Sequence, residues 1–267
     1  MLIYACVLVL AGNLRFTRTS MTEASSSEGM VRFRYEKPAL QDAPKVDVPL
    51  AKSAVLVMDV KVIRAGSTFS GEADPAAETL WFVMKGRARF YDGDDSTAGE
   101  FGRLEGVVVP RGVPCKFEPA GGGELAILRI TAIDPRADGV LKVSGLDKLQ
   151  PIRYDNPDFD EGRDIIVHRF WDGGDMLSIS VEKVRDGEGD DGPHAHFGIV
   201  GAWLMLSGRI RFHGALDADA FEIQTGDGVF LPSGNAYGFR AIEHEPAEIL
   251  HVKALDMRAE EHMRVDY

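Results

Sequence analysis

Short runs of apolar residues, separated by turn-forming residues, are the main pattern along this chain. Gly, Asp and Pro residues separate the runs at intervals of about 8–15 residues, a spacing typical of the strands of a β-sandwich or barrel. No segment between them has the length and period of a long amphipathic helix. The pattern therefore predicts an all-β protein. The clearest runs are rich in Val, Ile, Leu and Phe and cover Ala54–Val62, Leu80–Phe90, Gly106–Pro110 and Glu124–Ile130.

An internal repeat is the second feature of the pattern. The segment Trp81–Phe90 recurs as Trp203–Phe212, at an offset of 203 − 81 = 122 positions. Pro110–Gly112 recurs as Pro232–Gly234 at the same offset. Self-similarity at one fixed offset indicates a repeated structural unit, here of about 120 residues. We predict a tandem duplication of one all-β unit.

The repeat and the local composition divide the chain into four parts. The first part begins with an apolar run that is too short to span a membrane and continues with a Ser/Thr/Glu-rich stretch. We expect this part to be disordered or to result from an upstream start codon, and a weak export signal is the alternative. The third part is rich in Pro and Gly and has room for one short helix. The predicted parts are a lead-in (residues 1–30), a first barrel (31–134), a linker (135–166) and a second barrel (167–267).

Composition and charge narrow the class of function. Apolar residues make up 45% and charged residues 27% of the chain, as in ordinary globular proteins. The formal net charge of −12 disfavours binding to nucleic acid or to an anionic membrane surface. The two cysteines, Cys6 and Cys115, are too few for a disulfide framework or a Cys-rich zinc site. We expect a cytoplasmic protein with a small-molecule partner.

The motifs of each unit resemble those of the cupin superfamily, whose members are small jelly-roll barrels. The resemblance rests on a His-x-His pair, a following strand, and a later Gly-x5-Pro-x-Gly motif, and it covers roughly residues 45–256. It implies a fold of two tandem cupin jelly-roll barrels, a bicupin. It also implies two His and a Glu from the first motif and a third His from the second, all directed at one metal inside the barrel.

The second unit keeps part of this ligand set. His194 and His196 stand at the two His positions, and a His-x-His pair on an extended segment puts both rings on one face. Gly201 stands at the Glu position and Tyr237 at the third His position. The resemblance therefore implies a divalent transition metal (Fe, Mn, Ni, Cu or Zn) held by His194, His196 and Tyr237, with Tyr237 as a fourth ligand or a general acid–base. The alternative is that the protein binds no metal at this site.

The first unit has lost all its imidazoles. Glu72 and Asp74 occupy the His positions, Thr79 the Glu position and Cys115 the third His position. A carboxylate site for a hard cation is conceivable from these residue types. We expect instead a degenerate barrel that is kept for packing or for substrate shape.

Other residues each have a simpler interpretation. His168 and His251 lie on expected strands and could complete the site, but a structural or exposed His is the expectation. The acidic loop 186–192 could supply a carboxylate, or it is a solvated turn. His213 lies at a generic strand end, and Trp81 and Trp203 are expected to pack in the core. The paired arginines of the repeat are expected on an outward charged face: Arg87, Arg89, Arg209 and Arg211.

Three functional hypotheses follow from these residues. The first is a metal-dependent enzyme of the dioxygenase, decarboxylase or isomerase/lyase type with its site in the second barrel. The second is acid–base chemistry without a metal, as in some sugar-modifying cupins, by His194, His196 and Tyr237. The third is a barrel that binds a small ligand or carbohydrate without catalysis. We favour the first hypothesis. We also expect a homodimer, because exposed sheet edges pair readily.

Overall fold

The computed structural model describes residues 29–40, 43–92, 96–134, 146–154, 165–171, 176–189, 192–214, 220–242 and 246–255. Every regular element in these ranges is a β-strand, and all ladders between the strands are antiparallel. The all-β prediction is therefore confirmed. Within the same ranges no helix is long and apolar enough to cross a membrane. The expected lead-in up to residue 28 and most of the expected linker lie outside the described residues.

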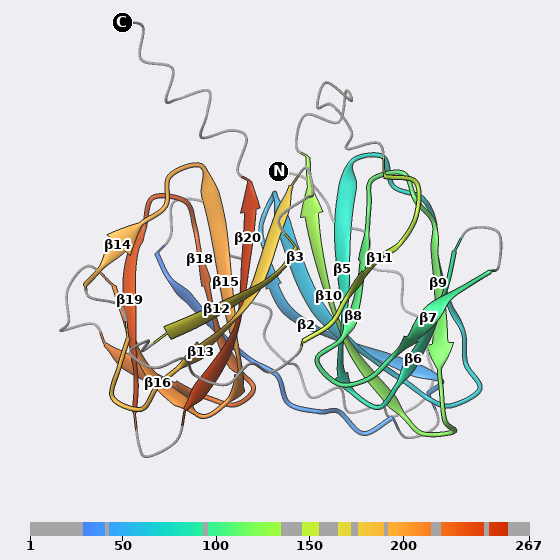
Figure 1. Ribbon diagram of the computed structural model, residues 1–267, viewed down its shortest axis with the longest axis horizontal. Coiled ribbons are helices and arrows are strands. Elements are labelled where there is room, and N and C mark those ends of the chain that lie inside the picture. Colours follow the sequence, from blue (N-terminus) through green and yellow to red (C-terminus); the bar gives the residue numbers. More distant parts are fainter. Residues whose placement is uncertain are drawn as a thin grey trace, which may run out of the picture.

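The strands form two barrels side by side (Figure 1). The first barrel has a six-stranded sheet in the order β11-β8-β5-β10-β3-β2 and a four-stranded sheet in the order β4-β9-β6-β7. Its strands are β2 (Lys45–Lys52), β3 (Leu56–Ile63), β4 (Phe69–Gly71), β5 (Ala77–Lys85), β6 (Ala88–Tyr91), β7 (Thr97–Phe101), β8 (Gly106–Val109), β9 (Cys115–Pro119), β10 (Leu125–Ile133) and β11 (Gln150–Ile152).

The second barrel repeats this arrangement. Its six-stranded sheet has the order β1-β18-β15-β20-β13-β12 and its four-stranded sheet the order β14-β19-β16-β17. Its strands are β1 (Val31–Arg34), β12 (Ile165–Trp171), β13 (Leu177–Val184), β14 (His194–Ala195), β15 (Ile199–Ser207), β16 (Arg209–His213), β17 (Phe221–Gln224), β18 (Asp227–Leu231), β19 (Ala236–Ala241) and β20 (Ala247–Leu255).

The two sheet orders correspond strand for strand, as the predicted duplication requires. The bounds of β5 and β15, and those of β10 and β20, differ by the offset found in the sequence. The fold class, two tandem jelly-roll barrels, is confirmed.

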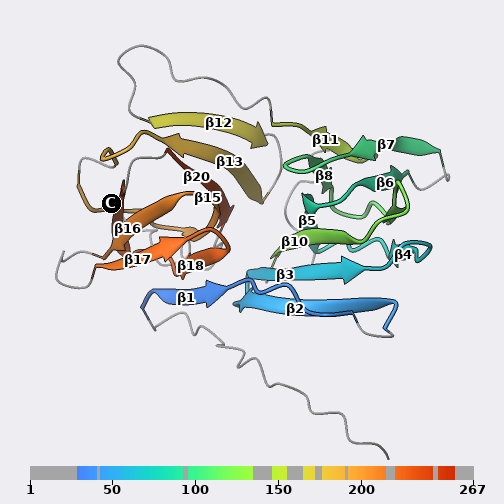
Figure 2. The ribbon, with the colours of Figure 1, turned by 90° about the horizontal axis from the view of Figure 1, so that it is seen from below.

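The chain crosses between the barrels at the ends of the repeat. β1 precedes the first barrel in sequence, yet it pairs with β18 of the second barrel (Figure 2). β11, within the predicted linker, takes the corresponding place beside β8 of the first barrel. Each barrel is thus completed by a strand from outside its own repeat unit, so the edges of the predicted domains are interleaved in space.

One predicted strand is split in two. The run Leu80–Phe90 forms the end of β5 and then β6, with Gly86 between them at φ 87°. A Cβ at Gly86 would lie 2.5 Å from the carbonyl oxygen of Glu124, so only glycine fits this turn. The apolar residues on both sides hid the turn from the sequence pattern.

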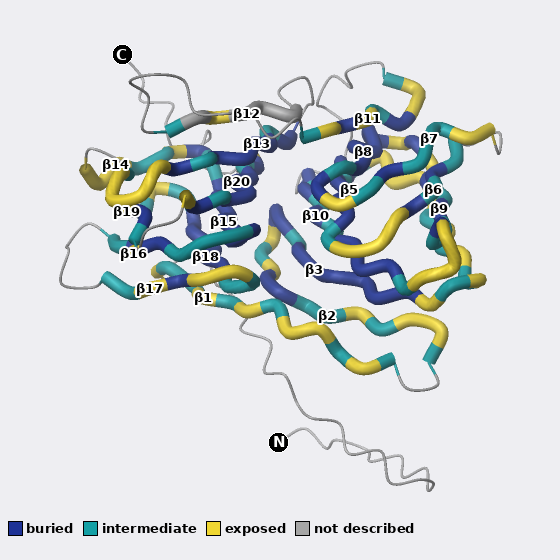
Figure 3. Tube along the Cα trace, turned by 60° about the horizontal axis from the view of Figure 1, so that its bottom comes forward, coloured by how far each residue is buried: buried dark blue, intermediate teal, exposed yellow. Residues whose placement is uncertain are grey.

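Both faces of the central strands of each six-stranded sheet are buried, which explains the continuous apolar runs. Along β5, Leu80 and Phe82 join a core between the two barrels, whereas Trp81 and Val83 fill the interior of the first barrel. The same alternation in the second barrel sends Trp203 and its alternate neighbours inward. Buried backbone accordingly concentrates in the middle of the molecule, where the sheets face each other (Figure 3).

Candidate functional site

Three of the predicted site residues meet at the Tyr237 hydroxyl, in the second barrel. The Nε2 atom of His194 lies 2.9 Å from this oxygen and the Nε2 atom of His196 lies 3.3 Å from it. Tyr237 is 2% exposed, His196 is half-buried and His194 is exposed. The three side chains therefore form a hydrogen-bonded chain from solvent to the interior of the barrel.

Strand pairing produces this arrangement. β14 is antiparallel to β19, and His194 lies directly opposite Tyr237 in the ladder. Side chains directly opposite each other share one face of a sheet, and so do residues two positions apart. His196, just beyond the end of β14, consequently lies on the same side of the chain as His194, and the two rings are 5.2 Å apart. The predicted convergence of the His-x-His pair is confirmed.

A second, buried pair lies behind this cluster. The Nδ1 atom of His251 lies 2.6 Å from Oε1 of Glu182. Burial alone would raise the pKa of Glu182, but the charge and hydrogen bond of His251, with Lys253 and His194, hold that pKa below its ordinary value. Glu182 is therefore a carboxylate that accepts a hydrogen bond, and Nδ1 of His251 must donate it.

His251 consequently has a defined orientation. Its Nε2 atom is buried and has no hydrogen-bond partner among the described residues. The ring stacks on Trp203 with ring centroids 4.4 Å apart. His251 is thus buried and hydrogen-bonded, as expected of a structural His, and its ring also lines the barrel interior.

The pKa of His196 is lowered below its ordinary value. Burial is the main cause, and the nearby positive charges of Lys253, His194 and His251 add to it, while Glu182 opposes them. His196 is therefore neutral at neutral pH, so its ring can exchange a proton with the Tyr237 hydroxyl.

The position of the expected acidic ligand is closed by Trp203. A Cβ at Gly201 would lie 2.4 Å from Cη2 of Trp203, a distance that Cβ atoms do not show in proteins. Trp203 also packs on Tyr237 with centroids 4.4 Å apart. The indole therefore occupies the space into which a side chain at residue 201 would point. The sequence pattern could not indicate this, because it predicts Trp203 only as a core residue.

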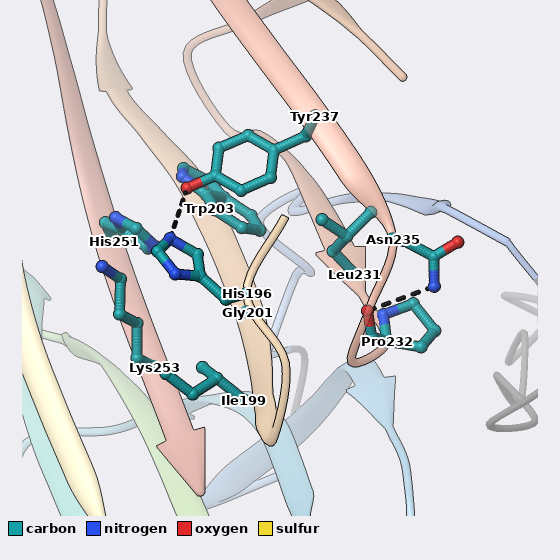
Figure 4. A pocket seen from close by; sticks show the side chains of 10 residues that line it. All are labelled: His196, Ile199, Gly201, Trp203, Leu231, Pro232, Asn235, Tyr237, His251 and Lys253. Carbon is teal, nitrogen blue, oxygen red and sulfur yellow. Dashed lines mark hydrogen bonds between the residues drawn. The ribbon is translucent and has the colours of Figure 1, made fainter. Parts of the chain in front are cut away.

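These residues surround a small cavity (Figure 4). Its volume is about 10 Å³, room for about one water molecule. His196, His251 and the Lys253 amine lie together on one side of it, and Tyr237 closes another side. Two further lining residues, Pro232 and Leu231, lie across from them. The cavity thus combines imidazoles, a phenol and an ammonium group with an apolar wall.

The donor set does not fit the metal centre that the resemblance implies. Among the described residues, no three His, Cys, Asp or Glu side chains converge as metal ligands. Trp203 excludes a carboxylate at Gly201, and Glu182 is engaged with His251. Lys253 also brings a positive charge to the cavity, which disfavours a cation there. Metal binding by His194, His196 and Tyr237 stays a prediction, which elemental analysis tests.

Among its described residues, the first barrel has no comparable cluster. Glu72 and Asp74 are exposed, and Asp74 accepts a hydrogen bond from the backbone of Ala76. The Thr79 hydroxyl lies 3.1 Å from that of Thr131. Burial raises the pKa of the Cys115 thiol to about 12, which makes it inert as a nucleophile. Aromatic rings fill the interior around Cys115: Phe69, Trp81, Phe90, Phe101 and Phe117.

The remaining candidates lie away from the cavity or outside the described residues. Nδ1 of His213 lies 2.8 Å from the carbonyl oxygen of Gly214. Arg89 pairs with Glu100 on the outer face of the first barrel, as expected of the repeated arginines. The side chain of His168 and residues 190–191 of the acidic loop are not described.

Comparisons with known proteins agree with this fold. Residues 180–253 match the family model for the cupin domain. None of the curated proteins matches the chain. Among solved structures, a putative glyoxylate-induced protein from Pseudomonas aeruginosa is similar over 96% of each chain, with a TM-score of 0.67 and 14% identity. A cupin 2 conserved barrel domain protein from Leptotrichia buccalis is similar over 79% of this chain and 89% of its own, with a TM-score of 0.60 and 14% identity.

An enzyme structure is also among the similar folds. Oxalate decarboxylase from Lactobacillus farciminis, as a formate complex, is similar over 86% of this chain and 87% of its own, with a TM-score of 0.62 and 12% identity. At these identities the likeness shows the fold alone. The family match covers the strands that carry Glu182, His194, His196, Tyr237 and His251. The chain therefore has a cupin fold, and residues 180–253 match the family model for the cupin domain.

Proposed function

We propose that the second barrel is a small-molecule enzyme site that transfers a proton to or from a carboxylate-bearing substrate without a metal. The observation that carries the proposal is the chain of hydrogen bonds from His194 through the Tyr237 hydroxyl to His196. General acid–base chemistry needs a titratable group within hydrogen-bond reach of a proton source. The three hydrogen-bonded side chains supply both the titratable group and the proton source, at a cavity with one open side.

Lys253 defines the class of substrate. Its amine lies beside His196 and His251 at the cavity, where a negative charge would be stabilised. Because the cavity holds about one water molecule, it accepts about one atom of the substrate, such as one oxygen of a carboxylate, and the rest of the substrate stays at the mouth. Phe197, next to His196 in the sequence, is 66% exposed and offers an apolar surface. The names of two similar structures, an oxalate decarboxylase with formate and a salicylate 1,2-dioxygenase, point to the same class of small carboxylates.

Each side chain then has one role. Neutral His196 removes a proton from the substrate carbon next to the carboxylate, and Tyr237 gives its proton to the carbon at the far end of the shifting double bond or to the leaving group. The His196 imidazolium then returns a proton to the Tyr237 phenolate through their hydrogen bond, which restores both groups. His194, which is exposed, exchanges the Tyr237 proton with solvent. Glu182 fixes the tautomer and orientation of His251, so that Nε2 of His251 faces the substrate. The expected reaction class is isomerisation or elimination next to a carboxylate.

Hydrogen–deuterium exchange into substrate carbon tests this proposal. Pools of small oxo- and hydroxycarboxylates are incubated with the protein in D₂O, and loss of C–H signals is followed by proton NMR. We expect exchange with the wild type and at least a hundred-fold loss in Tyr237→Phe, since general acid–base groups contribute about 10²–10⁴-fold. His213→Ala is the matched control, because His213 lies in the same barrel but outside the cavity. Equal exchange in Tyr237→Phe and wild type would refute the role of the phenol.

Elemental analysis of untagged protein tests the alternative. We expect far less than one transition metal per chain. About one metal per chain that disappears in a His194→Ala/His196→Ala variant would replace this proposal with the metal-dependent enzyme that the resemblance implies. If neither metal nor exchange is found while carboxylates bind, the barrel is a binding protein.

A further inference from the structure

A second cavity lies between the two barrels. Its volume is about 260 Å³. It is bounded by the ends of β5 and β15 and by the turns before β8 and β18. The segment after β1, which runs from the second barrel towards the first along the lower side in Figure 1, adds Tyr35 and Lys37.

Equivalent positions of the repeat line this cavity. Met84 and Leu206 correspond at the repeat offset, and so do Leu104 and Gly226. The cavity therefore lies where the two halves of the duplicated fold face each other. Because the paired residues differ, its two halves have different shapes and charges.

The floor of the cavity is apolar and includes a strained residue. Met84, Ala126 and Leu206 line it together with Leu104. Leu104 has φ 63°, in the left-handed region that favours glycine, whereas its counterpart Gly226 has φ 88°. A non-glycine residue held in this region is uncommon and marks a place where the surrounding structure requires that side chain. The Leu104 side chain forms one wall of the cavity.

The mouth of the cavity is cationic. Lys85 and Arg103 line it and are exposed, and neither makes an ion pair within the described part of the chain. Lys37 also lines it and pairs with Glu124. The Tyr35 hydroxyl is buried and has no hydrogen-bond partner among the described residues. Burial, together with the charge of Glu124, raises the pKa of Tyr35, so its hydroxyl remains a hydrogen-bond donor.

We propose that this cavity is a binding site for a small amphipathic carboxylate. The apolar tail lies against Met84, Leu104 and Leu206, and the carboxylate lies at the mouth between Lys85 and Arg103. A volume of 260 Å³ suits a chain of roughly ten non-hydrogen atoms. A ligand here contacts both barrels and therefore stabilises their association.

Isothermal titration with octanoate, octanamide and octylammonium tests the proposal. The three probes share one apolar tail and differ in the charge of the head group. We expect one octanoate per chain with a Kd of about 1 mM or tighter, a range suited to about ten non-hydrogen atoms. Octanamide should bind about ten-fold more weakly or worse, because it loses the charge-assisted hydrogen bonds. Equal binding of octanoate and octanamide would overturn the carboxylate assignment.

Variants place the binding in this cavity. Lys85→Gln/Arg103→Gln removes the two exposed charges and should reduce octanoate affinity to that of octanamide. Thr225→Trp, at an exposed residue on the rim, should fill the mouth and abolish binding of both probes. Lys253→Gln distinguishes the two cavities: the eight-carbon chain of octanoate has no room in the cavity of about 10 Å³ beside Lys253, so octanoate binding should not depend on Lys253.

The opposite pattern would overturn the proposal. If Lys253→Gln abolishes octanoate binding and Lys85→Gln/Arg103→Gln retains it, the carboxylate binds at the Tyr237 site instead. Absence of binding by the folded wild type would also overturn it. Neither result bears on proton transfer at Tyr237, which the deuterium exchange assay tests separately.

Discussion

Replacing Gly201 by alanine tests the claim that Trp203 has closed the position of the acidic ligand. The added methyl group would lie 2.4 Å and 2.6 Å from two carbons of the indole, about 1 Å inside ordinary contact. Trp203 cannot retreat freely, because it is 1% exposed and packs on His251 and Tyr237. Overpacking of a buried site costs about 1–3 kcal/mol.

Part of this destabilisation is offset by the effect of the substitution on the unfolded chain. Alanine loses less backbone entropy than glycine on folding, an advantage of about 0.5–1 kcal/mol. We therefore expect a net loss of about 1–2 kcal/mol, which lowers the Tm by roughly 2–8 °C in a chain of this size. Thermal unfolding followed by circular dichroism measures the change.

A double variant separates the clash from other effects. Trp203→Phe shortens the ring, so Gly201→Ala should cost about 1 kcal/mol less in that background, and the two substitutions should be coupled. Gly123→Ala is the matched control, because a Cβ at Gly123 has no neighbour within 4 Å. If Gly201→Ala costs no more than Gly123→Ala, or if the double variant is additive, the reasoning about the closed position is refuted.

Further predictions concern the hydrogen bonds, the pH dependence and the exchanged strand. Tyr237→Phe should cost about 1 kcal/mol of unfolding free energy in urea, because both imidazoles lose a partner but regain water. Because the pKa of His196 is lowered in the folded protein, His196 takes up a proton at a higher pH in the unfolded chain than in the folded one. The free energy of unfolding should therefore fall as the pH drops below about 6.5. An NMR titration that gives His196 a pKa at or above 6.5 would contradict this. Glu182→Gln should lower the free energy of unfolding by about 1–3 kcal/mol. It should also lower the pKa of His196 further, because the Glu182 charge raises that pKa, and an unchanged His196 pKa would disprove the coupling. A chain that begins at residue 35 should unfold at a lower temperature than one that begins at residue 29, because the loss of β1 exposes the edge of β18; equal Tm values would contradict the strand exchange.

The sequence determined the fold because the repeat and the turn residues carry local signals. The offset between Trp81 and Trp203 indicated the duplication, and the strand order of the two barrels agrees with it. The period of two along an extended chain was sufficient to bring His194 and His196 together, since it is a property of the backbone. The partner of this pair, Tyr237, was placed at the site by the resemblance to the cupin motifs.

Only the tertiary structure decided the rest of the site. β20 is buried on both faces, so Leu250 and Val252 face the other barrel while His251 and Lys253 face the interior. Such a strand reads as a nearly continuous apolar run, and the hydrophobic pattern cannot show which face a polar residue takes. The pairing of His251 with Glu182 joins residues on different strands, and no local pattern records it.

The exchange of β1 and the cavity between the barrels depend on tertiary structure for the same reason. A strand of four residues pairs with whichever sheet edge the rest of the fold leaves open, and that edge is formed by residues nearly 200 positions away. The conformation of Leu104 follows from packing against both barrels, although its residue type favours another region of backbone space. Local chemistry thus determined the strands and turns, while the contacts between distant strands determined which side chains share a cavity.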